Sequence, residues 1–157
     1  MSVGDSLKSD HQLARLLQIG IVLEEVVEAR ASKHLDTVSG DAAVANYMQA
    51  AVEESARHRN QLEDLIAELD AETVPFEEIE QLVEVTYEAD SDFDDVLYDQ
   101  LCNEETTYKF YEDLIAAIEA SDTAFSVSRD RLLSVLEAIR EEEAEGVEAV
   151  AQLMEEP

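Results

Sequence analysis

Four side chains that can bind a metal ion fall on apolar helical seams of this chain. Alternating steps of three and four residues, which follow one face of a helix, pass from Leu17 and Gly20 to Glu24 and on to Val27. The same steps place one polar residue among apolar neighbours in three other segments: His58, Glu104 and Glu143. A carboxylate on such a seam is costly to bury unless a charge or a metal partners it. One such residue in each of four helices is the arrangement of a carboxylate-bridged dimetal site inside a helical bundle.

The elements that must position these side chains are four long helices. Helical periodicity dominates the chain, and only four Gly and two Pro interrupt it. Capping residues and turn clusters predict that the helices begin near Ser9 or Asp10, at about Asp41, at about Phe93 and at about Ser128. Each helix is long enough to carry its polar residue near the middle.

The connection between the second and third helices is much longer than the other two. It contains a short predicted helix that begins at Pro75 and has an apolar face of Phe76, Ile79, Leu82 and Val83. Two antiparallel hairpins joined by a long crossover form the connectivity of ferritin-like bundles. We therefore expect an all-α, ferritin-like four-helix bundle in which residues 1–157 form a single domain. The alternative is a two-hairpin helical protein that dimerises to complete its core.

Three short stretches resemble the metal-binding helices of rubrerythrin-type ferritin-like proteins. Residues 103–112, NEETTYKFYE, are similar to the third helix of that family, in which a ligand Glu precedes a Tyr and then a Phe-Tyr pair. Residues 52–58 and 141–146 are similar to its second and fourth helices, which carry Glu-x-x-His. The resemblance implies a di-iron or manganese site with Glu24, His58, Glu104 and Glu143 as ligands. It also implies that Tyr108, one turn after Glu104, donates to a peroxide or holds a ligand carboxylate.

The chain departs from the family pattern at two positions. Ser55 stands where the second helix would have the Glu of its motif, and Gly146 stands where the last helix would have the His. Glu28 and Glu54 offer substitute carboxylates, each one turn from a seam ligand. A set rich in oxygen with one imidazole suits iron or manganese. We expect the second metal position, beside Gly146, to be open or weakly held.

The resemblance implies ferroxidase or peroxidase-like oxidoreduction of Fe(II), peroxide or O₂. Cys102 is the only cysteine, so a four-cysteine electron-donating domain is absent and electrons must come from Fe(II) itself or from an outside donor. The competing interpretation is a non-catalytic ferritin-like module with a degenerate metal site, which acts through protein–protein binding. The lost ligands at Ser55 and Gly146 favour it.

Each candidate ligand also has a structural alternative. Glu24 and Glu104 could flank their seams, because each adjoins a second Glu. His58 could be a hydrogen-bonded histidine between helices. Glu143 lies within the acidic run 141–145, and such runs are usually solvated faces.

The net charge of −29 comes from 39 acidic against 10 basic residues. At about 1 M salt the screening length falls to roughly 3 Å, which removes most of the repulsion among these charges. The balance is therefore typical of cytoplasmic proteins of salt-accumulating halophiles such as halophilic archaea. The alternative is an ordinary acidic protein. The negative charge disfavours nucleic acid and anionic membranes as partners. The longest apolar run, 19–23, is too short to span a bilayer. We also expect no signal peptide. We expect a cytoplasmic homodimer or larger homo-oligomer whose partners are metal ions and small oxidants.

Overall fold

The computed structural model describes residues 7–38, 40–80 and 96–155, and within these ranges the chain is helical apart from its turns and short connections, with no strand. Its long helices are α1 (Asp10–Thr37), α2 (Ala42–Glu68), α4 (Val96–Ala120) and α5 (Arg129–Glu155). Residues 76–80 form a further helical segment between α2 and α4, so the all-α prediction and the short helix after Pro75 are confirmed. The predicted apolar positions Leu82 and Val83 and the predicted helix start at Phe93 lie outside the described residues.

Side-chain caps fix the beginnings of the first two helices. The hydroxyl of Ser9 accepts a hydrogen bond from the backbone N–H of Gln12 at 3.2 Å. Asp41 Oδ1 accepts from the backbone N–H groups of Ala43 and Val44 at 3.1 and 3.2 Å. The sequence predicted that the first helix begins near Ser9 or Asp10 and the second at about Asp41, and the structure assigns the caps to Ser9 and Asp41. A side-chain oxygen at these positions satisfies N–H groups that a helix leaves unpaired at its start.

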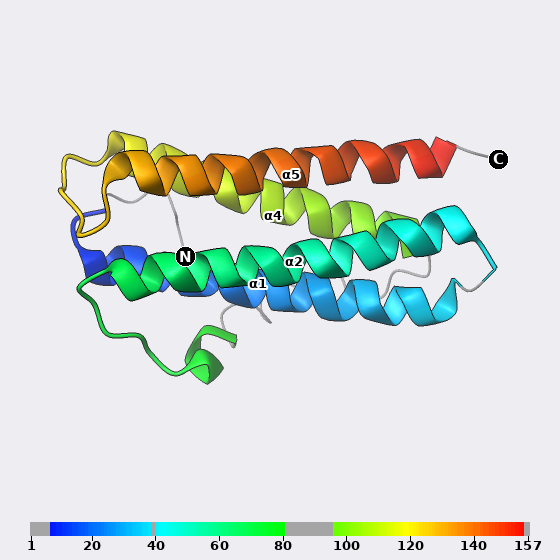
Figure 1. Ribbon diagram of the computed structural model, residues 1–157, viewed down its shortest axis with the longest axis horizontal. Helices are drawn as coiled ribbons and strands as arrows, with labels where there is room; N and C mark the ends of the chain where they lie inside the picture. Colours follow the sequence, from blue (N-terminus) through cyan, green and yellow to red (C-terminus); the bar gives the residue numbers. More distant parts are fainter. Residues whose placement is uncertain (1–6, 39, 81–95, 156–157) are drawn as a thin grey trace.

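The four long helices pack side by side, and contacting neighbours run antiparallel (Figure 1). Helix α1 packs against α2 and α4, and α5 packs against α4 and α2. Contacts between α1 and α4 show the direction, because Tyr111 of α4 reaches Glu24 whereas the earlier Asp99 reaches the later Arg30. Helix α2 ends at one end of the molecule and α4 begins at the other. The chain therefore traverses the length of the bundle between residues 68 and 96.

A buried polar layer separates two apolar clusters inside the bundle. The larger cluster includes Leu23 and Leu62, and the smaller one includes Ala31 and Ala51. Along α1, Glu24 lies between residues of the two clusters, and along α2 His58 does so too. The four helices therefore bring their polar residues to one level of the core, as the seam pattern predicted.

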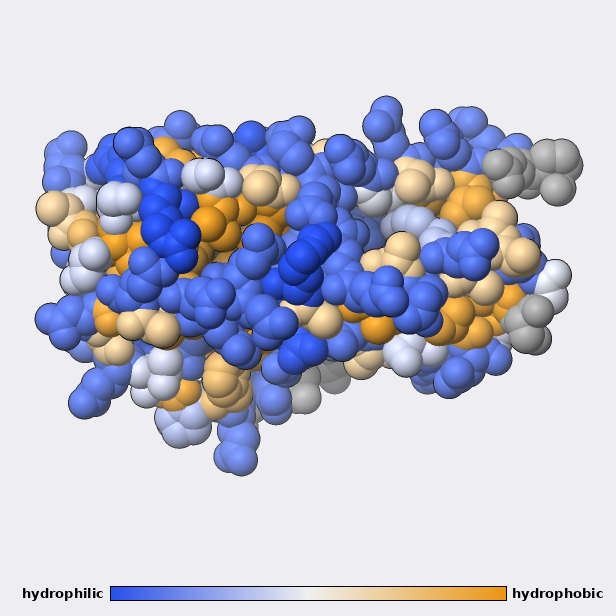
Figure 2. Space-filling model, in the orientation of Figure 1, coloured by the Kyte–Doolittle hydropathy of each residue, from blue (hydrophilic) through white to orange (hydrophobic). Residues whose placement is uncertain are grey.

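The surface differs sharply from this core. Figure 2 shows hydrophilic residues over most of the visible face, interrupted by small hydrophobic areas. The 39 acidic residues account for much of that character. Among the residues that the structure describes, no helix combines the length and hydropathy needed to cross a membrane.

Candidate metal centre

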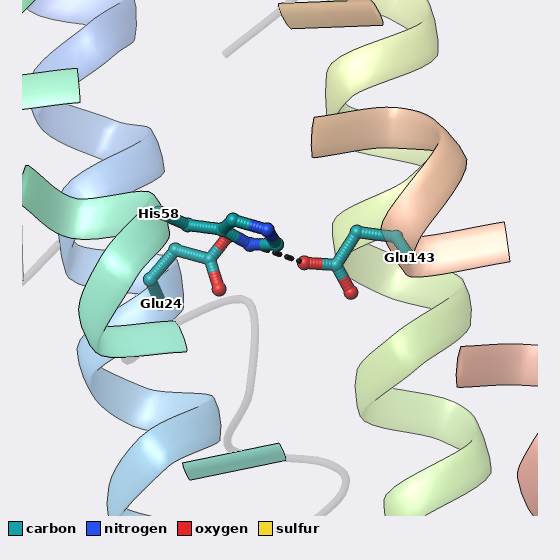
Figure 3. A group of neighbouring side chains, drawn as sticks. All are labelled: Glu24, His58 and Glu143. Carbon is teal, nitrogen blue, oxygen red and sulfur yellow. Dashed lines mark hydrogen bonds and ion pairs between the residues drawn. The ribbon is translucent and has the colours of Figure 1, made fainter. Parts of the chain in front are cut away.

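Glu24 of α1, His58 of α2 and Glu143 of α5 meet in the polar layer (Figure 3). His58 Nδ1 lies 3.1 Å from Glu24 Oε2 and 3.2 Å from Glu143 Oε1. The three residues are 0%, 0% and 3% exposed, in chain order. One ligand atom of each lies within 4.8 Å of the others, so the group could hold a metal ion.

Two hydroxyl groups of α4 orient the two carboxylates. Tyr111 donates to Glu24 Oε2 at 2.6 Å, and Thr107 lies 2.9 Å from Glu143 Oε2. The Thr107 hydroxyl also lies near two helical carbonyl oxygens, but a charged carboxylate is the stronger acceptor. On Glu24 these contacts all fall on Oε2, and the buried Oε1 has no hydrogen-bond partner. A buried polar atom without a partner costs about 1–3 kcal/mol, and a cation would satisfy it.

The fourth seam residue, Glu104 of α4, is 2% exposed and adjoins Glu143. Its Oε1 accepts hydrogen bonds from Tyr47 at 3.1 Å and from Gln100 at 2.9 Å. Burial, followed by the hydrogen bond to Glu143 and the charge of that residue, raises the pKa of Glu104 well above its ordinary value. These effects favour the protonated form of Glu104, which donates to the Glu143 carboxylate in this hydrogen bond.

Helix α5 makes room for the Glu104 carboxyl with Gly146. A Cβ atom at this position would lie 2.7 Å from Glu104 Oε2 and 3.0 Å from its Cδ. The hydroxyl of Tyr47 lies 3.1 Å from the Gly146 carbonyl oxygen and bridges the same gap. The expectation of an open metal position beside Gly146 is therefore wrong, because the carboxyl of Glu104 fills the space that a side chain would take.

The opposite side of the His58 ring faces two further carboxylates. His58 Nε2 lies 3.5 Å from Glu142 Oε1 and 3.8 Å from Glu54 Oε1, and this buried nitrogen has no hydrogen-bond partner. The side chains of Glu54 and Glu142 are 23% and 33% exposed. These three residues form a second group that could hold a metal ion. We call Glu24, Glu143 and His58 Nδ1 the inner group, and Glu54, Glu142 and His58 Nε2 the outer group.

The electrostatics of both groups favour bound positive charge. Burial acts to lower the pKa of His58, but the hydrogen bonds and charges of Glu143 and Glu24 outweigh it and raise the pKa to about 10. Burial raises the pKa of Glu54 to about 7, and burial together with the charge of Glu24 raises the pKa of Glu143. Protons on these residues reduce an excess of negative charge that a divalent cation would also neutralise.

The structure brings five of the predicted site residues together: Glu24, Glu54, His58, Glu104 and Glu143. It does not bring the other two to either group. Glu28 forms an ion pair with Arg59 at 2.6 Å, and its side chain is 26% exposed. The hydroxyl of Tyr108 interacts with Glu112, on the same helix.

Sequence reasoning missed several residues that contact the cluster. Three of them lie on the same face of α4 as Glu104 and could have been found from helical spacing. Gln100 lies four residues before Glu104, Thr107 lies three residues after it and Tyr111 lies seven residues after it. The seam pattern included Tyr111 but assigned it to the apolar core. No comparable signal identifies Tyr47 or Glu142, whose roles depend on how far α2, α4 and α5 are shifted along one another.

Comparisons with protein-family models, with curated proteins and with solved structures found no match to this chain. The side chains and their geometry therefore supply the basis for a function.

Proposed function

We propose that this chain is a ferritin-like protein that binds iron or manganese in its polar layer and acts as a non-haem oxidoreductase of rubrerythrin or ferroxidase type on Fe(II), peroxide or O₂. One observation carries the proposal. Glu24 and Glu143 are almost fully buried against a single imidazole, Glu104 is almost fully buried beside Glu143, and Glu24 Oε1 has no partner. Buried carboxylates normally have basic partners or metals. The antiparallel neighbours and the connection that runs the length of the bundle support the ferritin-like assignment.

The donor set fits these metals. Carboxylate oxygens and imidazole nitrogen are compatible with both iron and manganese. Glu24, His58 and Glu143 would hold the ion, and the protonated carboxyl of Glu104 would support Glu143 through its hydrogen bond. Tyr111 and Thr107 would fix the direction in which two ligands point, as hydrogen bonds to metal ligands commonly do.

Bound iron or manganese supplies electron exchange with O₂ or peroxide. The chain supplies the surroundings of that chemistry. The apolar clusters on either side of the polar layer keep bulk water out. The carboxyl of Glu104 holds a proton beside Glu143, while Tyr47 and Gln100 keep that carboxyl in place. A proton held at this point is available to a reduced oxygen species.

Anaerobic titration of Fe(II) or Mn(II) into metal-free protein in molar KCl tests the proposal. We expect at least one ion per chain by calorimetry and by metal analysis after gel filtration. Glu24→Gln and Glu143→Gln should weaken binding by more than the roughly 10–100-fold that loss of an outer hydrogen-bond partner costs. Glu25→Gln is the matched control, because it makes the same charge change one residue away on a side chain that is 40% exposed. Oxidation of Fe(II) by O₂ or peroxide should then follow metal binding across the variants.

A second candidate is a ferritin-like module that uses the polar layer for structure and acts through protein binding. The specific observation in its favour is that the carboxyl of Glu104 has Tyr47, Gln100 and Glu143 as partners without any metal. In that case Fe(II) and Mn(II) would leave the thermal midpoint unchanged, since an ion that does not bind the folded state cannot stabilise it. That result would exclude the first candidate.

A further inference from the structure

His58 presents its two ring nitrogens to two different pairs of carboxylates. Nδ1 faces Glu24 and Glu143 at 3.1 and 3.2 Å, and Nε2 faces Glu142 and Glu54 at 3.5 and 3.8 Å. The inner carboxylates are almost fully buried, whereas the outer two are 23% and 33% exposed. A cation that arrives from solvent therefore reaches the outer pair first.

The outer group is more than a surface pair of acids. The side chain of His58 is 0% exposed, and its Nε2 points between Glu54 and Glu142 without a hydrogen-bond partner. Desolvating an imidazole nitrogen and leaving it unpaired is unfavourable. A cation bound between the two carboxylates would give that nitrogen a partner.

We propose that Glu54, Glu142 and His58 Nε2 form an outer position that captures a divalent transition-metal ion and passes it to Glu24, Glu143 and His58 Nδ1. The proposal rests on the metal-binding function proposed for the inner group. Binding an ion displaces a proton from His58, and the neutral imidazole that remains has one nitrogen that accepts and one that carries a proton. His58 therefore binds an ion through one nitrogen at a time, and the two positions are occupied in turn rather than together.

The completed transfer leaves a stable arrangement. For the ion to move inward, the Nδ1 proton of His58 leaves by way of Glu24 or Glu143, and Nε2 takes up a proton from Glu54 or Glu142. With the ion on Nδ1, the Nε2–H of His58 then faces Glu142 and Glu54. A carboxylate behind a metal-binding histidine fixes the ring and strengthens the ligand. The same two carboxylates thus serve first as ligands and afterwards as support, which favours movement of the ion inward.

Arg57 controls access to the outer group. Its guanidinium donates two hydrogen bonds to Glu142 Oε2, one of them from Nη1 at 3.0 Å. Glu142 Oε1 is left to face His58. The Arg57 side chain is 49% exposed, so it can swing into solvent when a cation replaces its charge. Until it does, it repels an incoming ion.

Stopped-flow transfer of Mn(II) from a weak metallochromic indicator to the metal-free protein measures the uptake rate. We expect the Glu54→Gln/Glu142→Gln double variant to take up Mn(II) about tenfold more slowly, at the low end of the effect of charges that steer a ligand into a cleft. Its equilibrium affinity should fall by less than its rate. Arg57→Gln should take up Mn(II) faster than the parent. Glu141→Gln is the matched control, with the same charge change on a side chain that is 66% exposed, and it should keep the parent rate.

Glu24→Gln separates the two positions. It should retain an ion bound weakly and in rapid exchange at the outer group, seen as a broadened Mn(II) electron paramagnetic resonance signal. The uptake route would be overturned, and the inner site left intact, if the double variant kept the parent uptake rate. The same holds if its affinity for Mn(II) fell only because the ion was released faster. Absence of Mn(II) binding by the parent would overturn the inner site and the route together. Circular dichroism in the same molar KCl confirms that each variant is folded.

Discussion

Replacing Gly146 with alanine should destabilise this protein, although alanine is normally the better residue inside a helix. The added Cβ would lie 2.7 Å from Glu104 Oε2 and 3.0 Å from Glu104 Cδ, which is closer than the two groups can pack. Because the ladder of backbone hydrogen bonds holds α5 in place, the Glu104 side chain must move. Its Oε1 then loses its bonds from Tyr47 and Gln100, now 3.1 and 2.9 Å long.

The sign of the change follows from opposing terms. A buried hydrogen-bond partner left unsatisfied costs about 1–3 kcal/mol, and Gln100 is at risk here, whereas the Tyr47 hydroxyl can still donate to the backbone carbonyl oxygen at position 146. Forcing an extra carbon atom into a packed core adds about 1–3 kcal/mol. Alanine in place of glycine inside a helix returns about 0.5–1 kcal/mol. The free energy of unfolding should therefore fall by about 1–5 kcal/mol. How far the Glu104 side chain relaxes sets the value within that range.

A double-mutant cycle isolates the contact. Urea denaturation in molar KCl would be measured for Gly146→Ala, Glu104→Ala and the combination. Without the Glu104 carboxyl, Gly146→Ala should stabilise by about 0.5–1 kcal/mol, so the two changes should be strongly coupled. If Gly146→Ala alone stabilises the protein by that amount, the Glu104 carboxyl does not occupy the space over Gly146 and the account of this site is refuted.

Three further predictions concern salt, pH and the metal ligands. The protein should fold cooperatively in molar KCl and lose helix at low salt, because −29 charges repel over a longer screening length; equal circular dichroism and thermal midpoints at about 0.05 and 2 M salt would contradict this. In molar KCl the metal-free protein should lose stability as pH rises from about 5 to about 10, since folding raises the pKa of Glu54 from 4.5 to about 7 and that of His58 from 6.5 to about 10. The folded state then binds more protons than the unfolded state, and that stabilisation disappears as the groups lose them; a thermal midpoint that rises over this range would count against the buried cluster. Tyr111→Phe should weaken Mn(II) binding about 10–100-fold by removing the donor to Glu24, whereas Tyr108→Phe should not.

The sequence predicted the elements and the level of the polar layer well, for a local reason. Ser9 and Asp41 cap helices through bonds to residues two or three positions away, so the residue type and its neighbours contain the signal. Glu24 and His58 are buried because helical periodicity fixes which face of its own helix a residue occupies.

Partners across helices were harder to predict. Tyr111 and Tyr108 both follow Glu104 closely in the chain, yet only Tyr111 contacts Glu24, because it lies on the face of α4 that meets α1. Glu28 lies one turn from Glu24 but pairs with Arg59 of α2 instead. Periodicity gives the face of one helix. It does not give the shift of one helix along another, which decides these pairs.

Two buried polar networks among the described residues differ in charge in a way that bears on function: one links α1 and α4, and the other links all four long helices. In one, Asp99 is 5% exposed and is bound by Arg30 at 2.9 Å and His34 at 2.6 Å, so two basic side chains face a single carboxylate. Such a network can link helices without help. In the other, two buried glutamates, Glu24 and Glu143, share the single histidine His58, and a third, Glu104, adjoins Glu143. This is a costly way to hold helices together when a balanced pair is available in the same structure. The excess of carboxylates over basic partners therefore supports the proposal that this network binds a cation.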